Sequence, residues 1–166
     1  MPNSLGFGVV PNIQSPVDSD SIKYFSPRIG ASTISNRPAF RVYGSNSTNI
    51  TATTTLTTTQ GVTIDYNQGS YLNNTTGVFT APVAGLYQIN VNVRNGGNAS
   101  YSQLICYKNG SPVMVMIEFA GNSTMNHAGG STIAKLAVGD TLTLKCAAGS
   151  LSFDGNDNWS VAYLGW

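Results

Sequence analysis

Few side chains in this chain of 166 residues could carry out chemistry, and their spacing does not assemble a catalytic set. His127 is the single histidine, and it lies in a loop-like stretch just before two glycines. A serine hydrolase would need this histidine beside a nucleophile and an acid, and no nucleophile-elbow pattern accompanies it. Cys106 and Cys146 show no metal-ligand spacing with it. We therefore expect a solvated surface histidine and no enzymatic activity.

The second candidate for chemistry is the run FDGNDN, residues 153–158, which places Asp154 and Asp157 in a turn-rich segment. Calcium favours such oxygen donors, but the run lacks the full spaced set of calcium ligands. The residues therefore favour an ordinary polar loop. No Walker or dinucleotide-binding glycine pattern occurs, so no cofactor is expected.

The two cysteines do not form a disulfide-rich framework. Cys106 lies in SQLICYK and Cys146 in TLTLKCA, and both runs have the apolar pattern of a strand. Buried free thiols are the favoured interpretation. A disulfide between the two strands is the alternative.

The charge of the chain is unusually low. Charged residues make up 9% of the sequence and the formal net charge is +1, whereas an ordinary soluble domain has about 25% charged residues. Nucleic acid and anionic membrane are therefore not expected as partners. A domain with so little charge tends to associate, so assembly with other copies is the natural use of this composition.

Strand signals dominate from residue 38 onward. The run YQINVNV, residues 87–93, alternates between two faces as a half-buried strand does. Turn residues separate the candidate strands, while 44–49 is a turn-rich loop, and no segment has a helical period. Short strands at this spacing predict an all-β fold, an antiparallel two-sheet jelly-roll sandwich. The expected strands are 40–43, 62–66, 78–80, 87–93, 101–108, 112–119, 131–136, 141–146 and 159–164.

Residues 1–37 differ from this pattern. Prolines recur there without helical or strand periodicity, and Pro38 marks the end of the segment. Because proline fixes φ and removes a backbone donor, we expect an extended N-terminal arm. A disordered tail is the alternative, although the segment is more apolar than typical disordered chains. The candidate arm contacts are Leu5, Phe7, Val9, Val10, Ile13, Tyr24, Phe25 and Ile29.

Several segments after this arm resemble the globular head of complement component one-q, a relative of tumour necrosis factor. The match is densest in GSYLNNTTGVFTAPVAGLY, residues 69–87, and it continues in PAFRVY at 38–43, YKNGSPV at 107–113 and GGSTIAKLAVGDTLTL at 129–144. The resemblance covers residues 38–166 and implies a jelly-roll head that forms a homotrimer. Domains of this type also resemble those of bacteriophage virions.

The residues that carry this resemblance are expected to build the fold and not to perform chemistry. Aromatic side chains would lie in the core, glycine would permit a backbone that a side chain would strain, and Asn-Gly would form a type I′ turn. We expect Phe79 and Tyr87 on adjacent strands. The signature residues are Phe40, Phe79, Pro82, Gly85, Tyr87, Asn109, Gly110, Gly139 and Asp140.

Two functions follow as hypotheses. In the first, the chain is a homotrimeric capsid decoration or cement protein of a bacteriophage, located in the virion, whose arm binds the major capsid protein or another virion protein. In the second, it is the receptor-binding tip of a tail fibre, and loops 44–49, 95–100 and 154–158 recognise a host surface glycan or protein. Trp159 could then stack on a sugar, although a core position is favoured. A soluble cytokine-like or lectin-like host protein is a third and weaker alternative.

Overall fold

Residues 37–166 form one compact unit. The structure is a computed structural model that describes residues 37–45, 48–96, 100–121 and 126–165. The predicted arm contacts from Leu5 to Ile29 lie outside the described residues. No helix in the described ranges is long and apolar enough to cross a membrane.

The described chain is built almost entirely of strands joined by short turns. Its elements are β1 (Ala39–Gly44), β2 (Thr48–Thr51), a 3-10 helix η1 (Thr58–Gln60), β3 (Val62–Gln68), β4 (Leu72–Asn73), β5 (Val78–Thr80), β6 (Gly85–Asn95), β7 (Tyr101–Lys108), β8 (Ser111–Ala120), β9 (His127–Leu136), β10 (Thr141–Ala148), β11 (Ser150–Phe153) and β12 (Asn158–Gly165).

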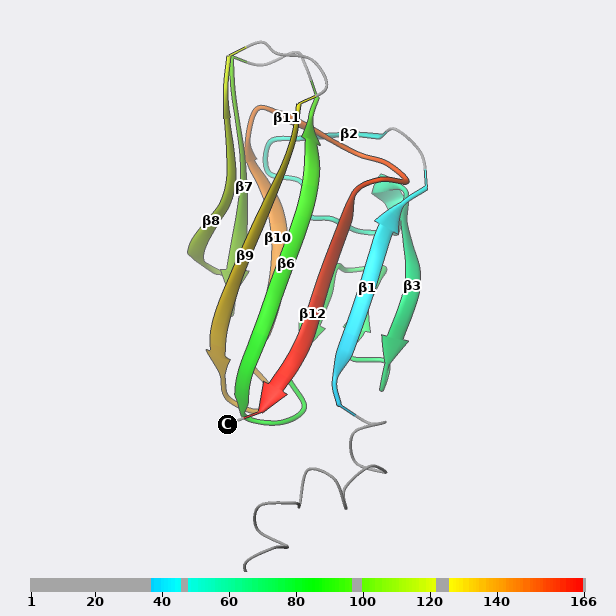
Figure 1. The fold of residues 1–166 in the computed structure, drawn as a ribbon, viewed down its shortest axis with the longest axis vertical. Coiled ribbons are helices and arrows are strands. Elements are labelled where there is room, and N and C mark those ends of the chain that lie inside the picture. Colours follow the sequence, from blue (N-terminus) through cyan, green and yellow to red (C-terminus); the bar gives the residue numbers. More distant parts are fainter. Residues whose placement is uncertain (1–36, 46–47, 97–99, 122–125, 166) are drawn as a thin grey trace, which may run out of the picture. The chain divides into compact units, whose positions relative to one another are not determined.

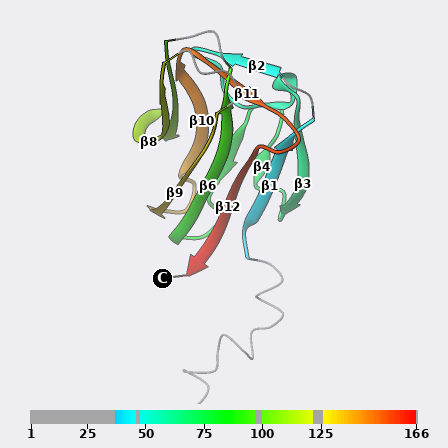
Figure 2. The ribbon, with the colours of Figure 1, turned by 45° about the horizontal axis from the view of Figure 1, so that its top comes forward.

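The strands form two antiparallel sheets that face each other (Figures 1 and 2). The first sheet runs β2-β11-β6-β12-β1-β3, and β9 pairs with β6 outside this path. The second sheet runs β4-β5-β10-β7-β8. This arrangement confirms the predicted antiparallel two-sheet sandwich. The alternation seen in 87–93 continues along all of β6, where every second side chain is buried.

Aromatic rings hold the two sheets together at the centre of the core. Phe40 on β1 meets Trp159 on β12 edge to face, with ring centroids 4.7 Å apart. Phe79 lies 5.5 Å from Phe40 and 5.7 Å from Tyr87. Each such pair adds about 0.5–1.5 kcal/mol beyond the burial of its area.

Phe79 and Tyr87 were expected on adjacent strands, and that expectation is wrong. Phe79 is on β5 in the second sheet and Tyr87 is on β6 in the first. The short bend 81–84 carries the chain from one sheet to the other. The two rings therefore face each other across the core and do not stand side by side within one sheet.

Candidate functional site

Three of the signature segments meet at one corner of the sandwich. The Ala81 N–H donates to the Asp140 carbonyl and the Gly139 N–H donates to the Ala81 carbonyl, both at 2.8 Å. The Asn109 side chain donates to Asp140 Oδ1 at 2.7 Å and accepts the Thr141 N–H at 2.8 Å. The β5–β6 bend, the β7–β8 turn and the β9–β10 turn are thereby tied together.

The other signature residues act on the backbone near this corner. Asn109 and Gly110 have φ values of 52° and 79°, as a type I′ turn requires. Pro82 lies in the β5–β6 bend. Gly85 has φ of 151°, and a Cβ there would overlap the ring of Tyr163.

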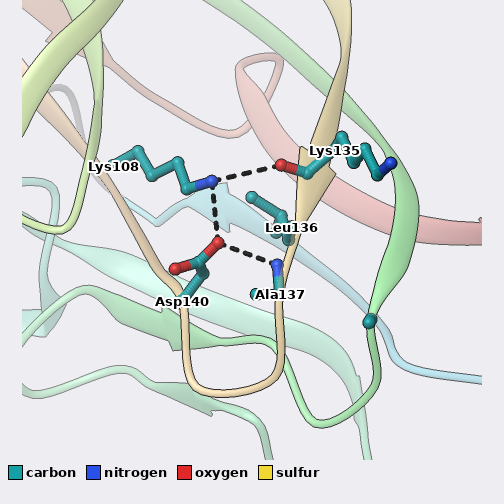
Figure 3. A pocket seen from close by; sticks show the side chains of 6 residues that line it. Lys108, Lys135, Leu136, Ala137 and Asp140 are labelled. Atoms are coloured by element: carbon teal, nitrogen blue, oxygen red, sulfur yellow. Dashed lines mark hydrogen bonds and ion pairs between the residues drawn. The ribbon is translucent and has the colours of Figure 1, made fainter.

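A shallow pocket of about 310 Å³ lies beside this corner (Figure 3). Lys108 Nζ is 2.7 Å from Asp140 Oδ2 and donates to the Lys135 carbonyl at 3.2 Å. The Ala137 N–H also donates to Asp140 Oδ2. Hydrogen bonds from Asn109 and Lys108 lower the pKa of Asp140 to about 2. The charges of Lys108 and Asp140 are paired with each other, so the corner is a structural joint.

A second cluster of charged groups lies at the opposite end of the sandwich, at the top of Figure 1. Arg94 near the end of β6 forms an ion pair with Asp154, and His127 at the start of β9 has Nδ1 3.4 Å from Asp157 Oδ1. The register of the first sheet sets Arg94 opposite His127. The turn between β11 and β12 supplies both carboxylates.

Asp157 is fully buried, which the sequence did not predict. Its Oδ2 accepts the Asp154 N–H at 2.8 Å, whereas Oδ1 has no hydrogen-bond partner among the described residues. Burial raises the pKa of Asp157 to about 6, although His127 and Arg94 act in the opposite direction. The expected polar loop is therefore a packed turn.

The carboxylates that were considered as calcium ligands in this turn have partners within the protein. Asp154 is paired with Arg94 and accepts the Asn156 N–H through Oδ1. In the described part of the chain, no group of three or more His, Cys, Asp or Glu side chains is placed to hold a metal ion. The carboxylates organise their own turn.

Two of the loops proposed for receptor binding, 44–49 and 154–158, are connected through described residues at this same end. The Gly44 N–H donates to the Asp154 carbonyl at 3.0 Å, and the Gly96 N–H donates to the Ser150 carbonyl at 3.0 Å. Trp159 is 1% exposed and packs in the core, so it cannot stack on a sugar. The favoured core position of this side chain is the one observed.

Comparison with known proteins places this sandwich in a family. The sequence profile of the C1q domain matches residues 39–165. The chain belongs to the C1q domain family. No curated protein matches the chain.

The C1q domain seen here has the jelly-roll fold of several solved structures. The globular domain of zebrafish complement 1qA has a TM-score of 0.62 at 19% identity, covering 78% of this chain and 98% of its own. Murine APRIL has a TM-score of 0.58 at 13% identity, covering 77% and 99%. Eiger, a TNF from S. frugiperda, has a TM-score of 0.56 at 12% identity, covering 78% and 94%. At these identities the likeness shows the fold.

One side of this C1q domain has two neighbouring strand edges. β8 pairs with β7 and β9 pairs with β6, and in the described ranges neither strand has a partner on its other edge. β8 and β9 approach so closely that a Cβ on Gly130 would overlap the Met116 carbonyl oxygen. Val113, Val115 and Ile133 on these strands are 52%, 48% and 57% exposed. We call these three side chains and their strands the β8/β9 edge.

The cysteines of the C1q domain are free and buried. Cys106 is on β7 and Cys146 on β10, and burial raises the pKa of each thiol to about 11. Such thiols are poor nucleophiles and poor ligands at neutral pH.

Proposed function

We propose that this protein is a homotrimeric structural protein of a bacteriophage virion, a capsid decoration or cement protein. Its C1q domain would form the trimer, and residues 1–37 would help to bind the shell through the major capsid protein or another virion protein. The observation that carries this proposal is the β8/β9 edge, which presents aliphatic side chains on two strands that each lack a partner on one side in the described ranges. The function proposed is assembly, without catalysis.

Unpaired strand edges are a liability that proteins usually cover, charge or shorten. Here both strands are ten residues long, and β8 displays Val113 and Val115 where a protective lysine would be typical. A neighbouring copy that covers this edge would remove apolar surface from water. This burial would stabilise the association by about 25 cal/mol for each Å2 of apolar surface. The low charge of the chain lets copies approach without strong repulsion. Three copies is the number that the resemblance to the complement head implies.

A charge placed on the β8/β9 edge tests this self-association. We expect Val115→Lys and Ile133→Lys to sediment as monomers at concentrations where the unaltered protein sediments at three times the mass of one chain. Val138→Lys is the matched control, because Val138 is 68% exposed but lies in the β9–β10 turn. If both edge variants remain trimeric, the copies associate through another surface.

Deletion of residues 1–37 tests the virion role separately. The shortened protein should stay trimeric but lose binding to purified shells. Binding that survives the deletion would remove the role proposed for the arm.

A receptor-binding tip of a tail fibre is the second candidate. It is supported by the hydrogen bond between the Gly44 N–H and the Asp154 carbonyl, which joins the described parts of loops 44–49 and 154–158. Copy number on the particle distinguishes the two functions. A decoration protein would be present in tens to hundreds of copies, and a fibre tip in a few copies at the tail.

A further inference from the structure

We propose that His127 and Asp157 form a proton-operated latch, which fastens the turn 154–157 to the start of β9 in a mildly acidic medium. This regulation acts at the loop end of the sandwich. It does not depend on the virion role or on the trimer.

The turn 154–157 is the point where several elements are joined. Its Asp154 carbonyl accepts the Gly44 N–H from the end of β1 and the Asp157 N–H from within the turn, at 3.0 and 2.9 Å. The Asp154 side chain pairs with Arg94 on β6. The Asp157 side chain closes the turn by accepting the Asp154 N–H. Any change at Asp157 therefore reaches β1, β6 and β9.

The contact between His127 and Asp157 would become a hydrogen bond if a proton were added. Asp157 Oδ1 and His127 Nδ1 are 3.4 Å apart and do not form a hydrogen bond. A proton added to either group creates a donor between them, as imidazolium with carboxylate or as carboxylic acid with imidazole. The first form is a charge-assisted bond, which is about twice as strong as a neutral one.

The charged groups around the His127–Asp157 pair already have partners of their own, so a change in pH acts on this pair. Arg94 on β6 and Asp154 in the turn face Asp157 as well, but they are paired with each other. His127 is half exposed at the start of β9, so protons reach it from solvent. Imidazole is also the side chain that ordinarily changes charge between pH 5 and 8.

The direction of the response follows from linkage. The pKa of Asp157 in the folded protein is about 6, above the ordinary value of about 3.9 in an unfolded chain. The folded state holds this proton more tightly, so stability from this group is complete below pH ~4 and is lost as pH rises through about 6. The latch closes on acidification.

Nuclear magnetic resonance can follow both partners in the full chain. His127 is the only histidine, so its ring signals are unambiguous. The Asp154 amide signal reports Asp157, because that amide donates to Asp157 Oδ2. Between pH 5 and 8 we expect the Asp154 amide signal to shift as Asp157 titrates, and that amide to exchange with solvent more slowly at the acidic end after correction for intrinsic exchange.

Two variants separate the partners. In Asp157→Asn the Asp154 amide should not titrate in this range, because the carboxyl group that it reports is removed. His127→Gln alters a half-exposed side chain and should fold; there the Asp154 amide should still titrate, with a higher midpoint. Asp65→Asn is the control, because Asp65 is exposed and pairs with Arg41 on the β1–β3 side.

The latch is overturned if the Asp154 amide does not titrate between pH 5 and 8 in the unaltered protein. It is also overturned if the Asp154 amide titrates with the same midpoint in Asp157→Asn, since Asp157 is then not the group that it reports. An Asp154 amide midpoint that is the same in His127→Gln would equally contradict the proposal.

Discussion

Gly85 holds the backbone between the two sheets in a conformation that residues with side chains rarely adopt. Its φ is 151°, and the Tyr163 ring and the Gly165 carbonyl occupy the space where a Cβ would lie. The Tyr163 hydroxyl donates to the Ala84 carbonyl at 3.4 Å, which places that ring over the glycine.

Gly85→Ala should therefore destabilise the protein by roughly 2–3 kcal/mol, through backbone strain and overlap together. Urea unfolding at fixed protein concentration measures this loss. Gly129→Ala is the matched control, because its Cβ would make an ordinary contact 3.5 Å from the Val91 carbonyl oxygen. Equal stability of the two variants would contradict the role assigned to Gly85.

Asp157 should make stability depend on pH in a defined window. Because its pKa rises by about two units on folding, ionising it in the core opposes folding by roughly 3 kcal/mol at neutral pH. Asp157→Asn should therefore gain stability relative to the unaltered protein as pH rises from 4 to 7. Urea unfolding across this range provides the measurement. A difference that stays constant with pH would show that the buried carboxylate is not the cause.

The thiols of Cys106 and Cys146 should be inert in the folded protein. Burial raises both pKa values to about 11, so the thiolate is scarce at pH 8. A colourimetric thiol reagent should react with neither cysteine before urea is added and with both afterwards. Rapid reaction without denaturant would show that the strands open locally.

At the scale of elements, the turns at Asn109 and Asp140 matter because they bond to each other as well as within themselves. Asp140 joins the β9–β10 turn to the β7–β8 turn through Asn109 and Lys108. Its pKa is lowered to about 2, so the stability that it provides is present above pH ~4 and is lost as pH falls toward 2.

Asp140→Asn should lower the thermal midpoint at pH 7, and its difference from the unaltered protein should shrink at pH 2.5. Differential scanning calorimetry at both pH values tests this. Asp65→Asn is a suitable control, because its ion pair with Arg41 is exposed and such pairs contribute little. An unchanged gap at pH 2.5 would mean that the Asp140 charge is not responsible.

The sequence predicted the long strands and missed the short ones for a physical reason. β6 shows a clear two-residue period because one face is buried. β11 is only four residues long and is buried on both faces, so it has no alternation to detect. β2 begins inside the segment interpreted as a loop, because its Thr and Asn residues resemble turn chemistry. Its pairing with β11 arises only in the folded chain.

The candidate site was less predictable than the fold. The residues of the run FDGNDN indicate a polar turn, and nothing local indicates that Asp157 is buried. Arg94 and His127, which pair with the carboxylates of this turn, lie far from it in the sequence and are set opposite each other by the β6–β9 register. Likewise the β8/β9 edge depends on which strands lack partners, and sequence periodicity does not report pairing.

At the scale of the molecule, the fold places different features at different ends. The signature corner and the proton-sensitive turn lie at opposite ends of the sandwich (Figure 1). Trimer formation and acid response rest on different side chains, Val115 and Ile133 for the first and His127 and Asp157 for the second, so they should vary independently. Ile133→Lys should abolish self-association in sedimentation experiments while the Asp154 amide keeps its titration midpoint. Coupled changes would show that the edge and the turn communicate.

The pairing of β1 also has a mechanical consequence. Residue 39 begins a strand that is hydrogen-bonded to β12 on one side and β3 on the other, and antiparallel bonds lie across the strand direction. A pull on the preceding chain, directed along β1, loads both rows of bonds in shear, so they must break together. Force applied through the N-terminal segment along β1 is therefore shared between the rows of bonds to β12 and to β3.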